Sequence, residues 1–157
     1  MLRIQVIAIG KVKEAWMRQG IAEYQKRLGA YCRLELIELE EYRLPDRPSP
    51  AEIDRGLEEE GRRILGKGSG LLCPLCIEGE MLTSPQLAQL LAEAAGETGC
   101  ISFVIGGSYG LSPQVKAAAA RKISFSHLTF PHQLARVLLF EQLYRACSIN
   151  AGGKYHK

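Results

Sequence analysis

Residues 101–110, ISFVIGGSYG, join a short apolar run to a glycine-rich loop. Ser102 to Ile105 are mostly β-branched or aromatic, as is typical of a buried strand. The glycines that follow would let backbone N–H and C=O groups approach a ligand closely. In open α/β sheets, ligands bind beyond the carboxyl ends of the strands. The stretch therefore predicts a ligand site at one edge of a parallel sheet.

The remaining segments alternate between strand and helix patterns. Strands are expected at residues 2–9, 32–39, 71–77, 102–105 and 123–125. Helices are expected at residues 14–28, 50–66, 84–96 and 131–147, with a short one after Ser112. This alternation predicts an α/β fold with a mostly parallel sheet of five or six strands and helices on both faces. Gly29 is expected to take the left-handed conformation after its helix.

Length and composition favour one domain over residues 1–157, with 46% apolar and 24% charged residues. No apolar run approaches the roughly 20 residues of a membrane span, and no secretory signal opens the chain, so a cytoplasmic protein is expected. A net charge of +3 leaves a nucleic-acid partner open. The five cysteines indicate reduced thiols. Cys73 and Cys76 have zinc or redox spacing, but their apolar surroundings favour buried packing, and no metal is expected.

Several common motifs do not fit. The glycines follow the fourth expected strand, whereas a dinucleotide-binding fingerprint follows the first strand of its unit. The pattern GxxxxGK[ST] of phosphate-loop NTPases does not occur. Ser108 does not lie in a nucleophile elbow, so a hydrolase is disfavoured.

The final expected helix, residues 131–147, is apolar almost all round, and one sheet can cover only one side of it. A second copy of the chain, in a homodimer, is the favoured cover for the other side. Burial under the chain's own loops is the alternative.

Three stretches carry a resemblance to a known family: IGGSYGLSP, then LTFPHQLARVLLFEQLYRA, then the terminal YHK. The chain resembles the RlmH (YbeA) family, SPOUT-class enzymes that methylate a pseudouridine of bacterial large-subunit (23S) ribosomal RNA. The similarity runs from residue 2 to residue 157. It implies S-adenosylmethionine as methyl donor, transfer to the 3-position nitrogen of pseudouridine, a homodimer whose site draws on both chains, and a trefoil knot in the C-terminal half.

Carried over residue by residue, the resemblance implies a donor site at the ends of three strands. Its expected members are Leu75, Gly106, Phe125, Ser126, His127, Leu128, Thr129 and Phe130. The chain departs from the family pattern LDxxGK at Cys76 and Glu80, which puts any role of those two side chains in doubt. A backbone contact at Leu75 would not depend on them.

The C-terminal tail carries the candidate acceptor side. Tyr155, His156 and Arg145 are the candidate catalytic residues, with His156 as possible proton acceptor. A frayed terminus without a role is the alternative. Lys154 and Arg136 are candidate contacts to RNA phosphates, as Arg145 also could be. Pairing with Glu141 is the alternative for Arg145. For His132, a packing and capping role is favoured.

These observations predict a methyltransferase acting on ribosomal RNA, with the assembled ribosome or subunit as the expected substrate. A SPOUT enzyme acting on another RNA position and a ribosome-binding module without catalysis are the alternatives.

Overall fold

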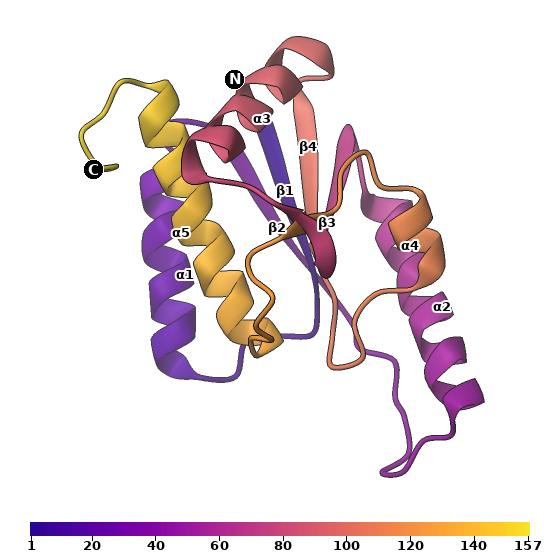
Figure 1. The fold of residues 1–157 in the computed structure, drawn as a ribbon. Coiled ribbons are helices and arrows are strands. Elements are labelled where there is room, and N and C mark those ends of the chain that lie inside the picture. The colour runs from indigo at the N-terminus through magenta and orange to yellow at the C-terminus, as the bar shows by residue number, and fades with distance from the viewer.

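The computed structural model describes residues 1–157 and contains a parallel sheet in the strand order β2-β1-β4-β3-β5 (Figure 1). The strands are β1 (Arg3–Ile9), β2 (Arg33–Leu39), β3 (Leu71–Met81), β4 (Cys100–Ile105) and β5 (Ile123–Ser124). The helices are α1 (Ala15–Leu28), α2 (Pro50–Lys67), α3 (Ser84–Glu97), α4 (Pro113–Ala117) and α5 (His132–Asn150). The predicted α/β fold with a five-stranded parallel sheet is confirmed.

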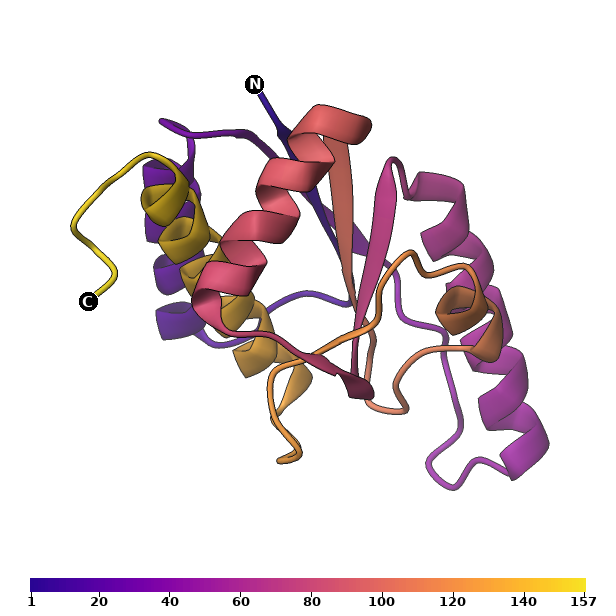
Figure 2. The same cartoon turned by 45° about the horizontal axis from the view of Figure 1, so that its top comes forward.

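Helices cover both faces of the sheet. Helices α1, α3 and α5 lie on one face, and α2 and α4 lie on the other (Figures 1 and 2). The two strands β1 and β4 are buried on both faces of the sheet. All residues of β4 and all but the first of β1 are buried. Alternate side chains point to opposite faces of a strand. Thus Ile4 and Val6 join the larger apolar cluster beneath α1, α3 and α5, while Ile7 and Ile9 join the smaller one beneath α2 and α4.

Capping residues in the sequence fix where helices α2 and α3 begin. Ser49 and Glu52 form a reciprocal capping box at the start of α2, as Thr83 and Gln86 do for α3. These bonds satisfy backbone N–H groups that the first turn leaves without partners. The expectation for Gly29 was wrong, because its φ of −57° is right-handed and it continues the last turn of α1.

Strand β3 runs further than residues 71–77 and changes partner on the way. It pairs with β4 as far as Pro74, whose missing N–H cannot extend a ladder. Beyond that point Leu75 pairs with Ile123 of β5, and after a register shift Glu80 pairs with Ile123 again. A Cβ atom at Gly79 would lie 2.6 Å from the carbonyl carbon of Ile123. Glycine therefore permits residues 75–81, here called the β3 curl, to cross β5 closely. The predicted trefoil knot stays a prediction.

Helix α5 packs against both α1 and α3, and it continues to Asn150, beyond the predicted end. Every residue from 132 to 149 is at least partly buried. Leu134 and Leu138 are only partly covered and are not among the side chains packed against the core. No helix of the structure combines the length and the apolar character needed to cross a bilayer.

Candidate functional site

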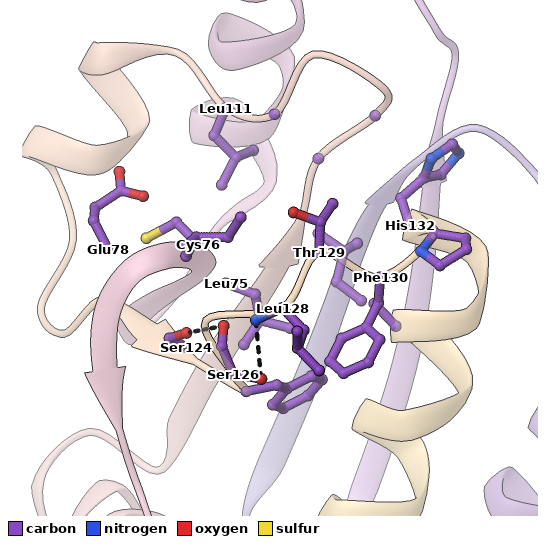
Figure 3. A pocket seen from close by; sticks show the side chains of 18 of the residues that line it. Leu75, Cys76, Glu78, Leu111, Ser124, Ser126, Leu128, Thr129, Phe130 and His132 are labelled. Atoms are coloured by element: carbon purple, nitrogen blue, oxygen red, sulfur yellow. Dashed lines mark hydrogen bonds between the residues drawn. The ribbon is translucent and has the colours of Figure 1, made fainter.

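A cavity of about 730 Å³ lies at the carboxyl edge of the sheet (Figure 3). Three loop segments supply most of its wall: the start of the β3 curl, the glycine loop after β4, and the segment that joins β5 to α5. Its lining residues are Leu75, Cys76, Ile77, Glu78, Ile105, Gly106, Gly107, Ser108, Gly110, Leu111, Lys116, Ser124, Phe125, Ser126, Leu128, Thr129, Phe130, Pro131, His132 and Ala135. The volume lies in the range typical of sites for small molecules and cofactors.

The glycine loop folds back on itself so closely that a side chain would not fit at Gly106. A Cβ atom at Gly106 would lie 2.4 Å from the carbonyl oxygen of Gly110. Gly110 has a φ of +82°, in the left-handed region that favours glycine, and its N–H donates to the Gly107 carbonyl over 3.1 Å. The turn leaves a stretch of backbone without side chains along one wall of the cavity.

Residues 125–130 form the opposite wall and are held by two short-range hydrogen bonds, both drawn in Figure 3. The Ser124 hydroxyl donates to the carbonyl of Ser126 over 3.0 Å, and the backbone N–H of Leu128 donates to the Ser126 hydroxyl over 3.0 Å. Leu128 is 70% exposed at the rim, while Phe125 and Phe130 are partly buried. The wall therefore presents apolar surface against which a flat ring can pack.

Seven of the eight expected donor-site residues line this cavity: Leu75, Gly106, Phe125, Ser126, Leu128, Thr129 and Phe130. His127 is exposed and is not part of the lining. The structure thus brings together three segments that are distant in the sequence.

Three further polar side chains line the cavity that the sequence did not single out as ligand contacts. Glu78 and Lys116 form an ion pair with an Oε1–Nζ distance of 2.6 Å. This hydrogen bond lowers the pKa of Glu78, which keeps the carboxylate ionised. His132, for which packing was favoured, also lines the cavity, and burial lowers the pKa of its imidazole. The sequence held no signal for the ion pair, since its members belong to different elements.

Cys76 lies on the same stretch of the β3 curl. Burial first, and the nearby Glu78 carboxylate second, raise the pKa of its thiol. Cys73 is fully buried, in agreement with a packing role. No three His, Cys, Asp or Glu side chains gather in the arrangement of a metal site.

The candidate catalytic residues of the tail form a cluster around Glu141 of α5. The Tyr155 hydroxyl donates to Oε1 of Glu141 over 3.1 Å, and the Arg145 guanidinium donates to the same oxygen over 2.7 Å. Arg145 also lies 3.2 Å from Nδ1 of His156 and packs over the Tyr155 ring. A guanidinium can only donate, so Nδ1 of His156 must accept and its proton must sit on Nε2. The tail is therefore tied down.

The environment of Tyr155 keeps its phenol protonated. Burial first, then hydrogen bonds with Tyr24 and Glu141, raise its pKa to about 12. In this arrangement Tyr155 serves as a hydrogen-bond donor and not as a base. The pairing of Arg145 with Glu141, which was the structural alternative for that residue, is observed.

This cluster lies far from the cavity of its own chain. His132 at the start of α5 lines the cavity, and Arg145 follows thirteen residues later in the same helix. At 1.5 Å per residue, the two positions are separated by roughly 20 Å along the helix axis. Figures 1 and 2 both place the tail at the opposite end of α5 from residues 125–130. One chain alone therefore does not join the tail to the cavity.

The two candidate RNA contacts differ in their accessibility. Lys154 is exposed in the turn after α5. The Arg136 side chain is 0% exposed, with its guanidinium 2.8 Å from the Glu38 carboxylate and bonded to the backbone carbonyls of Ile9 and Gly10. A phosphate cannot reach it in this arrangement. The expectation of an RNA contact at Arg136 is therefore corrected, because the side chain ties α5 to the ends of β1 and β2.

Residues 2–156 match the family model described as "Predicted SPOUT methyltransferase". The chain belongs to the SPOUT methyltransferase family. It is 46% identical to "Ribosomal RNA large subunit methyltransferase H" of Ligilactobacillus salivarius, over 99% of this chain and 100% of that protein. It is 48% identical to the protein of the same name from Exiguobacterium sibiricum, again over 99% and 100%. The predicted resemblance is thereby confirmed.

Two solved structures share this fold at low sequence identity. A probable methyltransferase from Bordetella pertussis Tohama I aligns with a TM-score of 0.58 and 16% identity, covering 93% of this chain and 95% of that chain. The tRNA (m1G37) methyltransferase from Aquifex aeolicus aligns with a TM-score of 0.54 and 15% identity, covering 92% and 69%. At such identities the similarity concerns the fold alone.

Proposed function

We propose that this SPOUT methyltransferase transfers a methyl group from S-adenosylmethionine to the 3-position nitrogen of a pseudouridine in large-subunit ribosomal RNA. The observation that carries the proposal is the cavity at the carboxyl edge, walled by the β3 curl, the glycine loop and residues 125–130. The full-length relatives named as large-subunit ribosomal RNA methyltransferases support the substrate class. The particular ring nitrogen rests on the resemblance of the glycine loop, the α5 sequence and the terminal YHK.

The residues of the cavity fit a nucleoside with a charged tail. Partly buried apolar side chains, among them Leu75 and Phe130, can enclose an adenine ring. The backbone bared at Gly106 can supply hydrogen bonds to the edge of that ring. When bound, S-adenosylmethionine supplies a methyl group already activated by its sulfonium. The chain then has to align the acceptor nitrogen and to remove its proton.

A second copy of the chain would complete the site. Leu134 and Leu138 form an apolar strip on α5 that this chain covers only in part. A twofold axis perpendicular to this strip would place the two copies of α5 against each other in opposite directions. In an antiparallel pairing, the tail of one copy would lie near the start of α5, and so near the cavity, of the other. We therefore propose a homodimer in which Tyr155, His156 and Arg145 serve the cavity of the partner copy.

In that composite site His156 would be the proton acceptor. Its Nδ1 already accepts from Arg145, so the imidazole must release this contact or turn before it can take a proton. Lys154, exposed beside it, would contact an RNA phosphate.

The proposal is tested with labelled S-adenosylmethionine and ribosomes from cells that lack this chain. The full chain is expected to label large-subunit ribosomal RNA at a pseudouridine. A variant lacking residues 155–157 should bind the donor as the full chain does, yet transfer methyl at a rate reduced by two orders of magnitude or more. An unchanged rate would remove the tail from the mechanism. Donor binding without transfer to any RNA would instead favour a ribosome-binding module.

A further inference from the structure

The ion pair of Glu78 and Lys116 stands out among the lining of the main cavity. Glu78 is the only acidic residue of that lining and Lys116 the only lysine or arginine. The two side chains come from the β3 curl and from α4. They remain 49% and 32% exposed although they are paired. The pair is thus accessible to a molecule that enters the cavity.

The pair has unused bonding capacity. A lysine ammonium has three donors and a carboxylate has about four acceptor positions, and their mutual contact uses one of each. The pair can therefore accept an ammonium group at Glu78 and donate to a carboxylate at Lys116 while staying together. A ligand group that carries both charges side by side is an amino acid.

The distribution of polar and apolar surface gives the cavity two different ends. Figure 3 shows Glu78 beside Cys76 on one side, and Leu128 and Phe130 on the other. The apolar side suits a nucleoside base, as argued above. The charged side suits the zwitterionic end of a ligand whose other end is that base.

We propose that Glu78 and Lys116 bind the amino-acid end of S-adenosylmethionine, with Glu78 facing its ammonium group and Lys116 its carboxylate. This inference rests on the proposed function and names residues of the same cavity. The pair would then give the cavity a higher affinity for ligands that carry the amino-acid end than for nucleosides that lack it.

A neighbouring ion pair provides a matched control. Glu80, two residues further along the curl, accepts two hydrogen bonds from Nη2 of Arg121, at 2.9 and 2.8 Å. Neither residue lines the cavity. Replacement of Arg121 by methionine removes an ion pair from the same curl without removing a charge from the cavity.

The test compares two probes by calorimetry on the full chain. S-adenosylhomocysteine carries the amino-acid end, and 5′-methylthioadenosine lacks it. Lys116→Met and Glu78→Gln should each lower the affinity for S-adenosylhomocysteine by about tenfold or more. This is the usual effect of losing a hydrogen bond to a charged group. They should change the affinity for 5′-methylthioadenosine less than twofold. Arg121→Met should leave both affinities within twofold of the original chain.

Two outcomes would overturn the inference. An unchanged affinity of both variants for S-adenosylhomocysteine would show that the pair does not contact the amino-acid end. An equal loss of affinity for both probes would show that the pair only supports the cavity wall. If the original chain binds neither probe, the proposed donor site itself fails, which is a separate result.

Discussion

Arg136 shows how one buried charge can organise several elements. Its guanidinium lies between the Glu38 carboxylate at the end of β2 and the carbonyls of Ile9 and Gly10 after β1. Burial lowers the pKa of Arg136, and the Glu38 carboxylate opposes that shift, so the buried guanidinium depends on the contact. Removing the Arg136 side chain would leave an internal void and would take a charged donor away from the carbonyls of Ile9 and Gly10.

Arg136→Ala is therefore expected to lower the free energy of unfolding by about 3 kcal/mol. Chemical denaturation at pH 7 measures this change. Lys154→Ala is the matched control, since an exposed cation should cost little stability. A stable Arg136→Ala protein with selectively weakened RNA binding would restore the phosphate contact that the burial argues against.

Cys76 offers a direct probe of the cavity. It is the only partly exposed cysteine, because the other four, Cys32, Cys73, Cys100 and Cys147, are buried. The raised pKa of the Cys76 thiol predicts slow alkylation at pH 7 that accelerates as the pH rises.

Under native conditions, iodoacetamide at pH 8.5 should modify one site per chain, and S-adenosylhomocysteine should protect it. Mass spectrometry of the intact chain and its peptides reads the result. Cys76→Ser should abolish the native modification. Equal alkylation with and without a saturating ligand would place the ligand outside this cavity.

Residues of the site were predictable to different degrees. Leu75, Gly106 and the segment after β5 could be named because sequence motifs mark them. Glu78 and Lys116 could not, since their meeting depends on where the β3 curl passes α4. Arg136 was misassigned because a helix pattern does not reveal that two strand ends supply its partners.

Among the elements, the β3 curl departs most from what the sequence indicates. An apolar run predicts a strand only as far as residue 77, whereas the backbone remains extended to Met81. Residues 78–81, EGEM, end the apolar run, and their pairing with β5 comes from a crossing between distant segments. Periodicity cannot report such a crossing, although it located the buried strands β1 and β4 well.

Gly79→Ala tests the closeness of this crossing. The added methyl would meet the Ile123 backbone, so we expect the free energy of unfolding to fall by at least roughly 2 kcal/mol. Gly96→Ala is the matched control, because nothing lies within 4 Å of its Cβ position in α3. This control should gain roughly 0.5–1 kcal/mol from helix propensity. Equal stability of the two variants, measured by denaturation, would show that the crossing is looser than described.

At the scale of the whole molecule, the two groups of residues proposed for the reaction lie apart within one chain. The cavity lies at the start of α5, and the tail cluster lies beyond its other end. Both the cavity residues and the tail residues could be predicted from the sequence. Their separation could not, because it depends on the length and direction of α5. The same helix carries the partly covered strip of Leu134 and Leu138, so association and activity are expected to be linked.

Light scattering at micromolar concentration should give a mass twice the 17.3 kDa of one chain. Leu134→Glu places a charge in the proposed interface and should shift the mass toward that of one chain. Because the cavity lies within each chain, the variant should keep its affinity for S-adenosylhomocysteine while losing methyl transfer. A monomeric original chain with full activity would exclude the composite site.

The proposed reaction is the methylation of a pseudouridine in large-subunit ribosomal RNA. Mass spectrometry of that RNA from cells with and without the chain tests it most directly. One pseudouridine fragment is expected to be heavier by one methyl group only when the chain is present, and to lose that added mass when residues 155–157 are deleted. Identical fragment masses in both cells, or a methyl group gained on a different nucleotide, would contradict it.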